Sequence, residues 1–276
     1  MDNKSILITG CSTGIGYEAA KKLREKGYRV FASARKQADV ERLRKEGFES
    51  MQLDLTDTAS IHSAVDEVLE KTGGTLYALF NNGAYGQPGA VEDLTTDVLR
   101  EQFETNFFGW HELTRRIIPV MRKQGYGRII QDSSVLGFVA FKYRGAYTAS
   151  KYAIEGLTDT MRMELKGTGI YVSLIEPGPI RTKFRENAYE AFKKNIDVEN
   201  SPNKEIYETL VAHRLATKDT GGGFTMEPSA VIFRLIHALE SRRPRIRYYV
   251  TIPTYVMATL KRNLPHWAMD FILSKM

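Results

Sequence analysis

Residues 9–16 read TGCSTGIG, a glycine-rich segment that is the strongest local indication of the fold. It follows a short apolar run at residues 5–9 and leads into a segment of helical periodicity at residues 15–26. The three glycines of the stretch permit a tight strand-to-helix turn and let the backbone approach a pyrophosphate at the positive end of the helix. Its spacing, G-x-x-x-G-x-G, differs from the usual G-x-G-x-x-G, and a plain turn is the alternative interpretation. The strand before it and the helix after it favour a dinucleotide site.

Short β-rich runs alternate with helical segments along most of the chain. The runs are almost wholly apolar, as expected of a parallel sheet that is covered on both faces. This alternation predicts an α/β fold, a single doubly wound domain of the Rossmann type with helices on both sides of a parallel sheet. We expect strands at residues 5–9, 28–34, 51–55, 76–81, 128–133, 170–176 and 247–252, and helices at residues 15–26, 58–72, 98–121, 146–165 and 229–240.

The composition is that of an ordinary globular chain of 276 residues, 42% hydrophobic and 26% charged. A single cysteine, Cys11, excludes an intramolecular disulfide framework and a Cys-rich metal site, and it fits a reducing cytoplasm. We expect no targeting segment, and no run approaches the roughly 18 apolar residues of a membrane span. The net charge is +6, but most Lys and Arg alternate with Asp and Glu, as on solvated helix faces. The exception is RRPRIR at residues 242–247, which we expect to be a solvated surface, with a site for an anionic partner as the alternative. We expect no nucleic-acid partner.

The end of the second expected strand indicates which dinucleotide binds. An NAD site usually offers Asp or Glu at this point to hold the ribose 2′-hydroxyl. This chain reads FASARK, with Ala34 followed by Arg35. A guanidinium favours a 2′-phosphate by charge and by its fork geometry, whereas Arg35 on a solvated turn is the alternative. Together with Ser12 in the glycine loop, this predicts NADP(H) rather than NAD(H).

A tyrosine and a lysine four residues apart lie on one face of a helix, within reach of each other. The chain contains three such pairs: Tyr17/Lys21, Tyr147/Lys151 and Tyr189/Lys193. Only Tyr147/Lys151, in YTASK at 147–151, follows a serine at the end of an expected strand, either Ser133 or Ser134. Strand ends at the carboxyl edge of such a sheet are where ligands bind. This context favours Tyr147/Lys151 as a catalytic pair.

Six motifs occur in an order and spacing that resemble the short-chain dehydrogenase/reductase family over residues 3–182, and more loosely to about residue 250. They are TGCSTGIG at 9–16, FNNG at 80–83, TNFFG at 105–109, DSSVLG at 132–137, YTASK at 147–151 and EPGPIRT at 176–182. Within the family the chain looks closest to bacterial NADP-dependent reductases related to the 17β-hydroxysteroid and retinol dehydrogenase branch. The resemblance implies hydride transfer between a carbonyl and an alcohol, with four catalytic residues, Asn106, Ser134, Tyr147 and Lys151.

The resemblance also implies a role for each catalytic residue. Tyr147 is the acid in reduction and the base in oxidation; Lys151 and the nicotinamide cation would favour its phenolate over a free phenol, whose pKa is about 10. Ser134 hydrogen-bonds the substrate oxygen, and Ser133 is off by one from the family pattern. Asn106 lies at a local kink inside a long helix, where its carbonyl holds a water that connects Lys151 to solvent. On propensity alone, Asn106 is equally well a surface or cap residue.

Cofactor contacts follow from the same resemblance. Asp54, after the third strand, would meet the adenine, and Ile180 and Thr182 would clamp the nicotinamide carboxamide. The chain departs from the family at residues 81–84, where NNGA replaces NNAG. The predicted cofactor residues are Gly10, Ser12, Thr13, Gly14, Ile15, Gly16, Arg35, Asp54, Leu55, Asn82, Gly83, Tyr147, Lys151, Pro177, Gly178, Ile180 and Thr182; no metal is expected.

The part of the chain after residue 182 differs in composition, being polar and charged with two Gly/Pro/Asn breaks. We expect a substrate-binding insertion or lid at residues 183–226, a last helix and strand at 227–252, and a tail at 253–276, all within the one domain that spans residues 1–276. Apolar residues here and in nearby loops pack a lid or contact an apolar aldehyde or ketone, retinoid- or steroid-like. These residues are Leu136, Phe138, Val139, Phe141, Phe184 and Tyr189.

The expected partners are the small-molecule substrate and further copies of the chain. The resemblance implies a homodimer or homotetramer through the helices at 98–121 and 146–165. The tail, with Trp267 and Phe271, packs in the core or in a dimer contact, and contact with a membrane surface is the alternative. The alternative function is that of a regulatory protein that binds NADP(H) and catalyses no reaction. It has to be considered because a fold alone does not prove a function. Nothing in the sequence supports a second rival, an isomerase or dehydratase.

Overall fold

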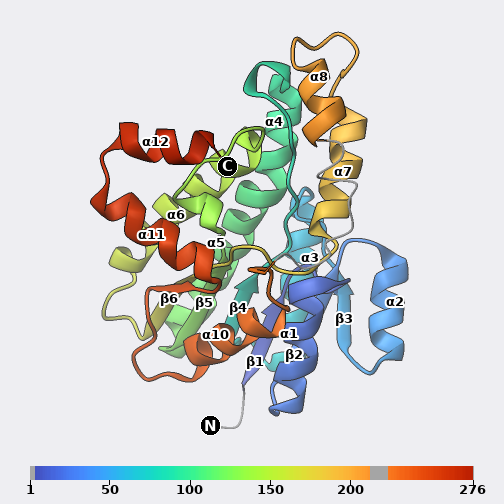
Figure 1. The fold of residues 1–276 in the computed structure, drawn as a ribbon. Coiled ribbons are helices and arrows are strands. Elements are labelled where there is room, and N and C mark those ends of the chain that lie inside the picture. Colours follow the sequence, from blue (N-terminus) through green and yellow to red (C-terminus); the bar gives the residue numbers. More distant parts are fainter. Residues whose placement is uncertain (1–3, 212–222, 276) are drawn as a thin grey trace.

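Seven parallel strands form one twisted sheet in the order β3-β2-β1-β4-β5-β6-β7 in the computed structural model, which describes residues 4–211 and 223–275 (Figure 1). The strands are β1 (Ser5–Ile8), β2 (Arg29–Ala34), β3 (Glu49–Gln52), β4 (Ala78–Asn81), β5 (Gly127–Asp132), β6 (Ile170–Glu176) and β7 (Arg247–Tyr249). The strand order reverses between β1 and β4. In open α/β sheets a ligand crevice lies at this switch point, outside the carboxyl ends of the strands.

Helices cover both faces of the sheet (Figure 1). They are α1 (Gly14–Glu25), α2 (Gln37–Lys45), α3 (Thr58–Thr72), α4 (Thr96–Phe103), α5 (Gly109–Gln124), α6 (Gly145–Glu164), α7 (Phe184–Asn195), α8 (Lys204–Ile206), α10 (Ser229–Glu240), α11 (Ile252–Asn263) and α12 (His266–Ser274). Short helical turns are η1 (Val91–Asp93), η2 (Glu104–Phe108), η3 (Val135–Gly137) and η4 (Tyr207–Val211).

Two apolar cores lie on opposite faces of the sheet, as the apolar strands predict. Ile6 and Ile8 of β1 pack with α1, α2 and α10, whereas Leu7, between them, packs with α3, α5 and α6. All three side chains are fully buried. Burying a side chain of this size stabilises the folded state by about 1.5–3 kcal/mol. A strand that is apolar on both faces is therefore most stable in the middle layer, with helices covering both of its faces. The doubly wound architecture is therefore confirmed.

Several expected boundaries were wrong. β3 is formed by Glu49–Gln52 rather than residues 51–55. The last strand, expected to reach residue 252, stops at Tyr249, and Ile252 already begins α11. Pro253 stands in the first turn of that helix, where its missing N–H costs no hydrogen bond, and this explains the early end of the strand.

Other helices differ from expectation. The helix expected at residues 98–121 is three pieces, α4, the π-helix η2 and α5. α2, α7, α11 and α12 were not expected from the sequence. In α2 only Val40 and Leu43 are buried, which is too few apolar positions to show a helical period in so polar a segment.

The tail forms two helices that pack on the loop after β5. Met257 of α11, Met269 of α12 and Val139 of the loop form a small buried cluster. The expectation that the two large aromatic residues of the tail pack in the core was wrong, because Trp267 is 75% exposed and Phe271 is 65% exposed. No helix in the described part of the chain combines the length and the apolar character that a membrane crossing requires.

Candidate active site

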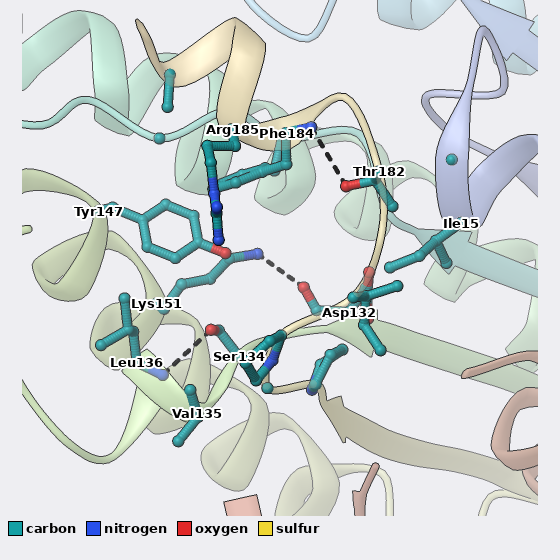
Figure 2. Close-up of a pocket in the computed structure, with 18 of the residues that line it drawn as sticks. Ile15, Asp132, Ser134, Val135, Leu136, Tyr147, Lys151, Thr182, Phe184 and Arg185 are labelled. Atoms are coloured by element: carbon teal, nitrogen blue, oxygen red, sulfur yellow. Dashed lines mark hydrogen bonds between the residues drawn. The ribbon is translucent and has the colours of Figure 1, made fainter. Parts of the chain in front are cut away.

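A cavity of about 590 Å³ opens at the carboxyl ends of the central strands (Figure 2). Its size is typical of a cofactor or small-molecule site. The structure brings together here most of the predicted site residues. Those that line it are Gly10, Ser12, Thr13, Gly14, Ile15, Asn82, Gly83, Ser134, Tyr147, Lys151, Pro177, Gly178, Ile180 and Thr182. Glycine-loop, catalytic and PGPIRT residues, separated by up to about 170 positions, thus face one space.

The glycine loop lies tightly against the segment after β4. Gly10 has φ +73°, and a Cβ placed on it would lie 2.6 Å from Cα of Gly83. A Cβ on Gly16 would lie 2.4 Å from the carbonyl oxygen of Gly10, so both positions require glycine. Gly16 itself packs beneath the loop and does not line the cavity. Backbone amides are therefore brought close to the space where a pyrophosphate would lie.

The NNGA departure is accommodated by hydrogen bonds to the end of β1. The Thr9 hydroxyl accepts from the backbone N–H groups of Asn82 and Gly83, each at 2.9 Å. The Asn82 amide nitrogen donates to the carbonyl of Thr9 at 2.8 Å. Gly83 is fixed further by Trp110, whose indole N–H donates to the Gly83 carbonyl at 2.8 Å. The segment thus keeps a defined backbone beside the glycine loop.

Cys11, in the middle of the glycine loop, is fully buried. Its thiol donates to the carbonyl of Ile8 at 3.3 Å, and its backbone N–H donates to the carbonyl of Ser33 at 2.8 Å. Burial raises the pKa of the Cys11 thiol to about 12. The side chain therefore anchors the loop to the sheet and plays no part as a thiolate at neutral pH.

Tyr147 and Lys151 project from the first two turns of α6 into the cavity (Figure 2). Lys151 is 1% exposed; its Nζ donates to the backbone carbonyl of Asp132 at 2.7 Å and lies 4.3 Å from the ring centroid of Trp110. In all three Tyr/Lys pairs the lysine ammonium lies over the ring of its own tyrosine, but the other two pairs do not line this cavity. Position in the cavity, rather than spacing, distinguishes Tyr147/Lys151 from the other two pairs.

Burial dominates the electrostatics of the pair. Burial is the main cause that raises the pKa of the Tyr147 phenol above its usual value, and the charge of Asp132 adds to it, while Ser134 and Arg144 act in the opposite direction. Burial lowers the pKa of Lys151 to about 8, against Asp132 and Glu155, which raise it. Tyr147 therefore stays protonated at neutral pH, which suits an acid.

Ser133 and Ser134 both line the cavity, but only Ser134 interacts with Tyr147. The Ser134 hydroxyl accepts from the backbone N–H of Leu136 at 3.1 Å and interacts with the Tyr147 phenol, whose pKa it lowers. The Ser133 hydroxyl instead lowers the pKa of Glu155, two helical turns beyond Tyr147 in α6. Of the two serines, Ser134 is the one next to the Tyr147 phenol.

Asn106 lies at the kink that was expected in the long helix. It is fully buried within the π-helix η2, a distortion often found at functional sites. Its side chain binds both backbone groups of Tyr85: Oδ1 accepts from the N–H at 3.1 Å, and Nδ2 donates to the carbonyl at 2.9 Å. Nδ2 also lies 3.2 Å from the Ser150 hydroxyl of α6. Asn106 does not line the cavity, and it connects α6 with the segment after β4.

Besides Gly16, three predicted cofactor residues lie outside the cavity, at the neighbouring ends of β2 and β3. Arg35 is exposed directly after β2. The Asp54 carboxylate accepts from the N–H and the hydroxyl of Thr56, at 2.9 and 2.8 Å. Leu55 is buried against Gly109, on which a Cβ would lie 2.1 Å from the Leu55 carbonyl oxygen. These residues share the carboxyl edge of the sheet with the glycine loop, on the side of β2.

Apolar side chains form one wall of the cavity. Of those expected near the substrate, Leu136, Phe141 and Phe184 line it. Phe138 and Val139 pack behind this wall in one cluster with Phe141 and Met257, and Tyr189 packs in another cluster. The Phe184 ring meets the Tyr147 ring edge-on, with 5.2 Å between the centroids.

Sequence reasoning missed several lining residues, namely Asp132, Arg144, Arg185, Phe224, Pro253 and Met257. Figure 2 shows Arg185 extending from the start of α7 toward Tyr147. Proximity to the catalytic motifs could have indicated Asp132 and Arg144. Pro253 and Met257 come from a helix that the sequence did not predict. Within residues 4–211 and 223–275, no three His, Cys, Asp or Glu side chains are grouped so that they could hold a metal ion.

Comparison with known sequences points to one family of oxidoreductases. A family model described as short chain dehydrogenase matches residues 4–193. An uncharacterized oxidoreductase of Escherichia coli strain K12, YbbO, is 43% identical over 270 residues, which cover 98% of this chain and 94% of that protein. The 17-beta-hydroxysteroid dehydrogenase type 6 of Bos taurus is 32% identical over 284 residues, covering 100% and 89%. Human retinol dehydrogenase 8 is 30% identical over 265 residues, covering 94% and 85%.

Solved structures give the same picture. A short-chain dehydrogenase from Streptomyces avermitilis superimposes with a TM-score of 0.79 at 26% identity, covering 99% of this chain and 94% of that chain. Actinorhodin polyketide ketoreductase with NADPH gives 0.73 at 26% identity, covering 90% and 96%. A Burkholderia phymatum protein in complex with NAD has the same fold, with 0.79 at 23% identity and coverage of 99% and 95%. Both NAD and NADPH thus occur among structures that resemble this chain.

Proposed function

This chain belongs to the short-chain dehydrogenase family, and we propose that within it the protein is an NADP(H)-dependent reductase of an apolar aldehyde or ketone. Membership makes it an oxidoreductase that uses a nicotinamide dinucleotide. The observation that carries the finer proposal is the convergence of Ser134, Tyr147 and Lys151 on one cavity with an apolar wall. The catalytic roles, the cofactor preference and the substrate class are our proposal.

The residues of the cavity fit a dinucleotide. The first turn of α1 has no side-chain cap, so its free N–H groups, next to Gly14 and Ile15, remain available to a pyrophosphate. Gly10 and Gly16 leave no room for a side chain between that turn and the sheet. The Asp132 Oδ1 atom is buried without a hydrogen-bond partner and adjoins the cavity, as an acceptor that a bound hydroxyl could satisfy. When bound, the cofactor supplies the hydride.

The chain's own residues handle the proton. The Ser134 hydroxyl donates a hydrogen bond to the substrate carbonyl oxygen, which fixes its position and stabilises the charge that develops there. The Tyr147 phenol, protonated at neutral pH, gives its proton to that oxygen as the alcohol forms. The ammonium of Lys151 lies beside the phenolate that remains and stabilises it until a proton returns. Asn106 keeps α6, and with it both side chains, in register with the segment after β4.

The preference for NADP(H) rests on the end of β2. Ala34 ends the strand, Arg35 follows it on the surface, and no acid stands on the strand to hold a ribose 2′-hydroxyl. The guanidinium of Arg35 and the ammonium of Lys36 complement a 2′-phosphate by charge. Burial raises the pKa of the Tyr85 phenol, and the charge of Arg35 acts against this rise, so the two side chains lie near each other at this edge.

The apolar wall supports a substrate with a hydrophobic body next to its carbonyl group. Leu136, Phe141, Phe184 and Met257 form that wall. The names of the retinol and hydroxysteroid dehydrogenase relatives support a retinoid- or steroid-like compound, or a long or aromatic aldehyde, for this chain. We propose residues 183–226 as a substrate-binding lid; α7 provides the part of it that adjoins Tyr147, and residues 212–222 lie outside the described part of the chain.

We further propose a cytoplasmic homodimer, or a homotetramer built from it, paired through α5 and α6. Phe108, just before α5, is 48% exposed and Leu157 of α6 is 37% exposed, which is consistent with an apolar contact between copies. Elution of the protein at the mass of a monomer of 31.3 kDa in gel filtration would count against this assembly.

The test of the proposed function is consumption of NADPH, with NADH in parallel, against aldehydes and ketones of graded size. Wild-type protein and Tyr147→Phe are compared, with Tyr17→Phe as the matched control from a Tyr/Lys pair outside the cavity. We expect turnover with NADPH that is lost in Tyr147→Phe and retained in the control. Tight binding of NADPH without turnover of any carbonyl or alcohol would instead support a regulatory protein.

A further inference from the structure

The positive charge of the chain is concentrated at its C-terminal end. Residues 241–276 contain seven Lys or Arg and a single acid, Asp270, which gives this segment a net charge of +6. The whole chain also has a net charge of +6, so the 240 residues before this segment are neutral in sum. One of the seven, Arg247, forms ion pairs with Glu155 and Asp159 and donates a hydrogen bond to Glu176. Of the other six, Lys261 and Arg262 belong to α11 and Lys275 directly follows α12, whereas Arg242, Arg243 and Arg245 stand in the loop before β7.

The same segment exposes large apolar side chains. Ile252 and Val256 of α11 are 65% and 46% exposed, and Trp267 and Phe271 of α12 are 75% and 65% exposed. A surface helix of a globular protein normally carries polar residues on its outer face. Here Trp267 and the outer residues of α11 depart from that pattern. Apolar groups gathered on a surface mark a site of contact with a partner or a membrane.

Cations lie beside the exposed Phe271 ring and the half-buried Tyr249 of β7. Lys275 Nζ is 5.7 Å from the ring centroid of Phe271, and an Arg262 guanidinium nitrogen donates to the Tyr249 hydroxyl at 3.2 Å. Long basic side chains that run along apolar surface and end in water are the arrangement found where helices lie in the interface of a bilayer. From the charge and the exposed apolar residues together, we infer that the flank formed by α11 and α12 docks on the surface of an anionic lipid bilayer.

The inner face of these helices connects the flank with the active-site cavity. Pro253 and Met257 of α11 line the cavity, and Met257 also packs with Met269 of α12. Figure 1 shows α11 and α12 together on one side of the molecule, with α2 and β3 on the other. A docked protein would therefore hold one wall of its cavity next to the bilayer, and an apolar substrate dissolved in lipid would reach it over a short path. This last step rests on the proposed function, whereas the docking itself does not.

Charge argues against two other occupants of the flank. A second copy docked face to face would bring two positive surfaces together, which costs binding energy. Nucleic acid would be attracted by the charge, but it offers no partner for the exposed Ile252, Trp267 and Phe271. A bilayer with acidic headgroups satisfies both observations, since each basic residue near such a surface contributes about 1 kcal/mol of attraction.

Vesicle flotation tests the inference with the full chain and needs no turnover, so its failure is distinguishable from failure of the proposed function. Vesicles of phosphatidylcholine mixed with phosphatidylglycerol are compared with vesicles of phosphatidylcholine alone. Wild-type protein is compared with Trp267→Ser/Phe271→Ser and with Lys261→Gln/Arg262→Gln, which changes the two basic residues in the last turn of α11. Matched controls change exposed residues elsewhere: Met163→Ser for the apolar variant and Arg122→Gln/Lys123→Gln for the charge variant. Unchanged circular dichroism and Tm verify that each variant is folded.

We expect wild-type protein to float with the mixed vesicles at low salt, and both flank variants to partition about tenfold less, a loss of about 1.4 kcal/mol. The controls should float like wild type. The inference is overturned if wild type stays with the unbound protein, or if a control loses as much binding as its flank variant. It is equally overturned if the flank variants float like wild type, or if Trp267→Ser/Phe271→Ser turns an oligomer into a monomer in gel filtration without vesicles, which would assign the flank to a second copy.

Discussion

Lys151 Nζ donates its hydrogen bond to the backbone carbonyl of Asp132, at 2.7 Å, and not to the Asp132 carboxylate. The position of the ammonium is thus fixed by the end of β5, and its charge is balanced by a side chain on the same residue. A substitution at Asp132 can change the charge beside Lys151 without removing the hydrogen bond that positions it. The buried site therefore lets charge and geometry be separated by experiment.

The first prediction uses this separation in Asp132→Asn. Asp132 raises the pKa of both Lys151 and Tyr147, and Lys151 titrates at about 8 in its presence. Without the carboxylate both pKa values fall, so the alkaline limb of kcat/KM for carbonyl reduction should move to lower pH. Rates from pH 6 to pH 10 measure the shift. Asp97→Asn, on the exposed start of α4, is the control, and an unmoved or more alkaline limb would refute the coupling.

The second prediction distinguishes the two adjacent serines. Ser134→Ala should lower kcat/KM about 10²–10³-fold, because it removes a donor to the developing oxyanion. Ser133→Ala should stay within a few-fold of wild type, since its hydroxyl acts on Glu155 rather than on Tyr147. Steady-state rates with the same substrate and saturating NADPH provide the comparison. Equal losses in the two variants would mean that the turn after β5 acts only as a structural unit.

The third prediction concerns cofactor choice. Arg35→Glu should raise the Kd for NADPH about 10–100-fold, which corresponds to losing a charge-assisted hydrogen bond of about 1.5–3 kcal/mol. It should tighten NADH binding, because an acid at this position can hold the ribose 2′-hydroxyl. Cofactor fluorescence titration measures both constants without any substrate. Lys45→Glu, an exposed basic residue at the end of α2, should change neither. Unaltered NADPH affinity in Arg35→Glu would place the 2′-phosphate elsewhere.

The fourth prediction is a dependence of stability on pH that arises from Glu176. Burial, followed by the charge of Glu155, raises the pKa of the Glu176 carboxyl from 4.5 to about 9. Between these values the unfolded chain releases the proton while the folded chain keeps it, so the folded state loses stability as the pH rises from about 4.5 to 9. Glu176→Gln removes this loss. Its Tm should exceed that of wild type by a few degrees at pH 9, and the gap should shrink toward pH 5.

Glu112 provides a control of the opposite sign. Hydrogen bonds from Arg115 and His62 lower the pKa of its carboxyl to about 2. Its contribution to stability is therefore present above pH 4.5 and is lost as the pH falls toward 2. Glu112→Gln should be less stable than wild type at pH 7, and the difference should disappear in acid. If both variants showed the same trend with pH, carboxylate burial would not be the cause.

The sequence predicted the sheet and the centre of the site because both depend on local patterns. Runs such as 5–9 and 128–133 are apolar on both faces, as in a covered parallel sheet. YTASK lies in the first two turns of α6, so the helical spacing assumed for its tyrosine and lysine is the one observed. The kink at Asn106 was also predicted from the resemblance, and the π-helix η2 confirms it.

What the sequence did not reveal depends on contacts between distant residues. The protonated state of Tyr147 follows from burial and from Asp132, and neither can be read from the spacing of Tyr147 and Lys151. The cavity wall at Pro253 and Met257 belongs to a helix that follows β7 by two residues, and the β-branched run before it resembled a longer strand. Exposure of Trp267 could not be inferred from its type, because large apolar residues are usually buried.

Cys11 makes the glycine loop a natural reporter of opening. It is the only thiol in the chain, and it is sealed beneath the loop with a pKa of about 12. A thiol reagent needs both access and a thiolate, so alkylation of the native protein can proceed only when this loop lifts from the sheet. The rate of a single mass increment, measured without any engineered label, therefore records how often the dinucleotide loop opens. A cofactor bound across Gly10 and Ser12 should slow that rate, which turns an inert core residue into a binding assay.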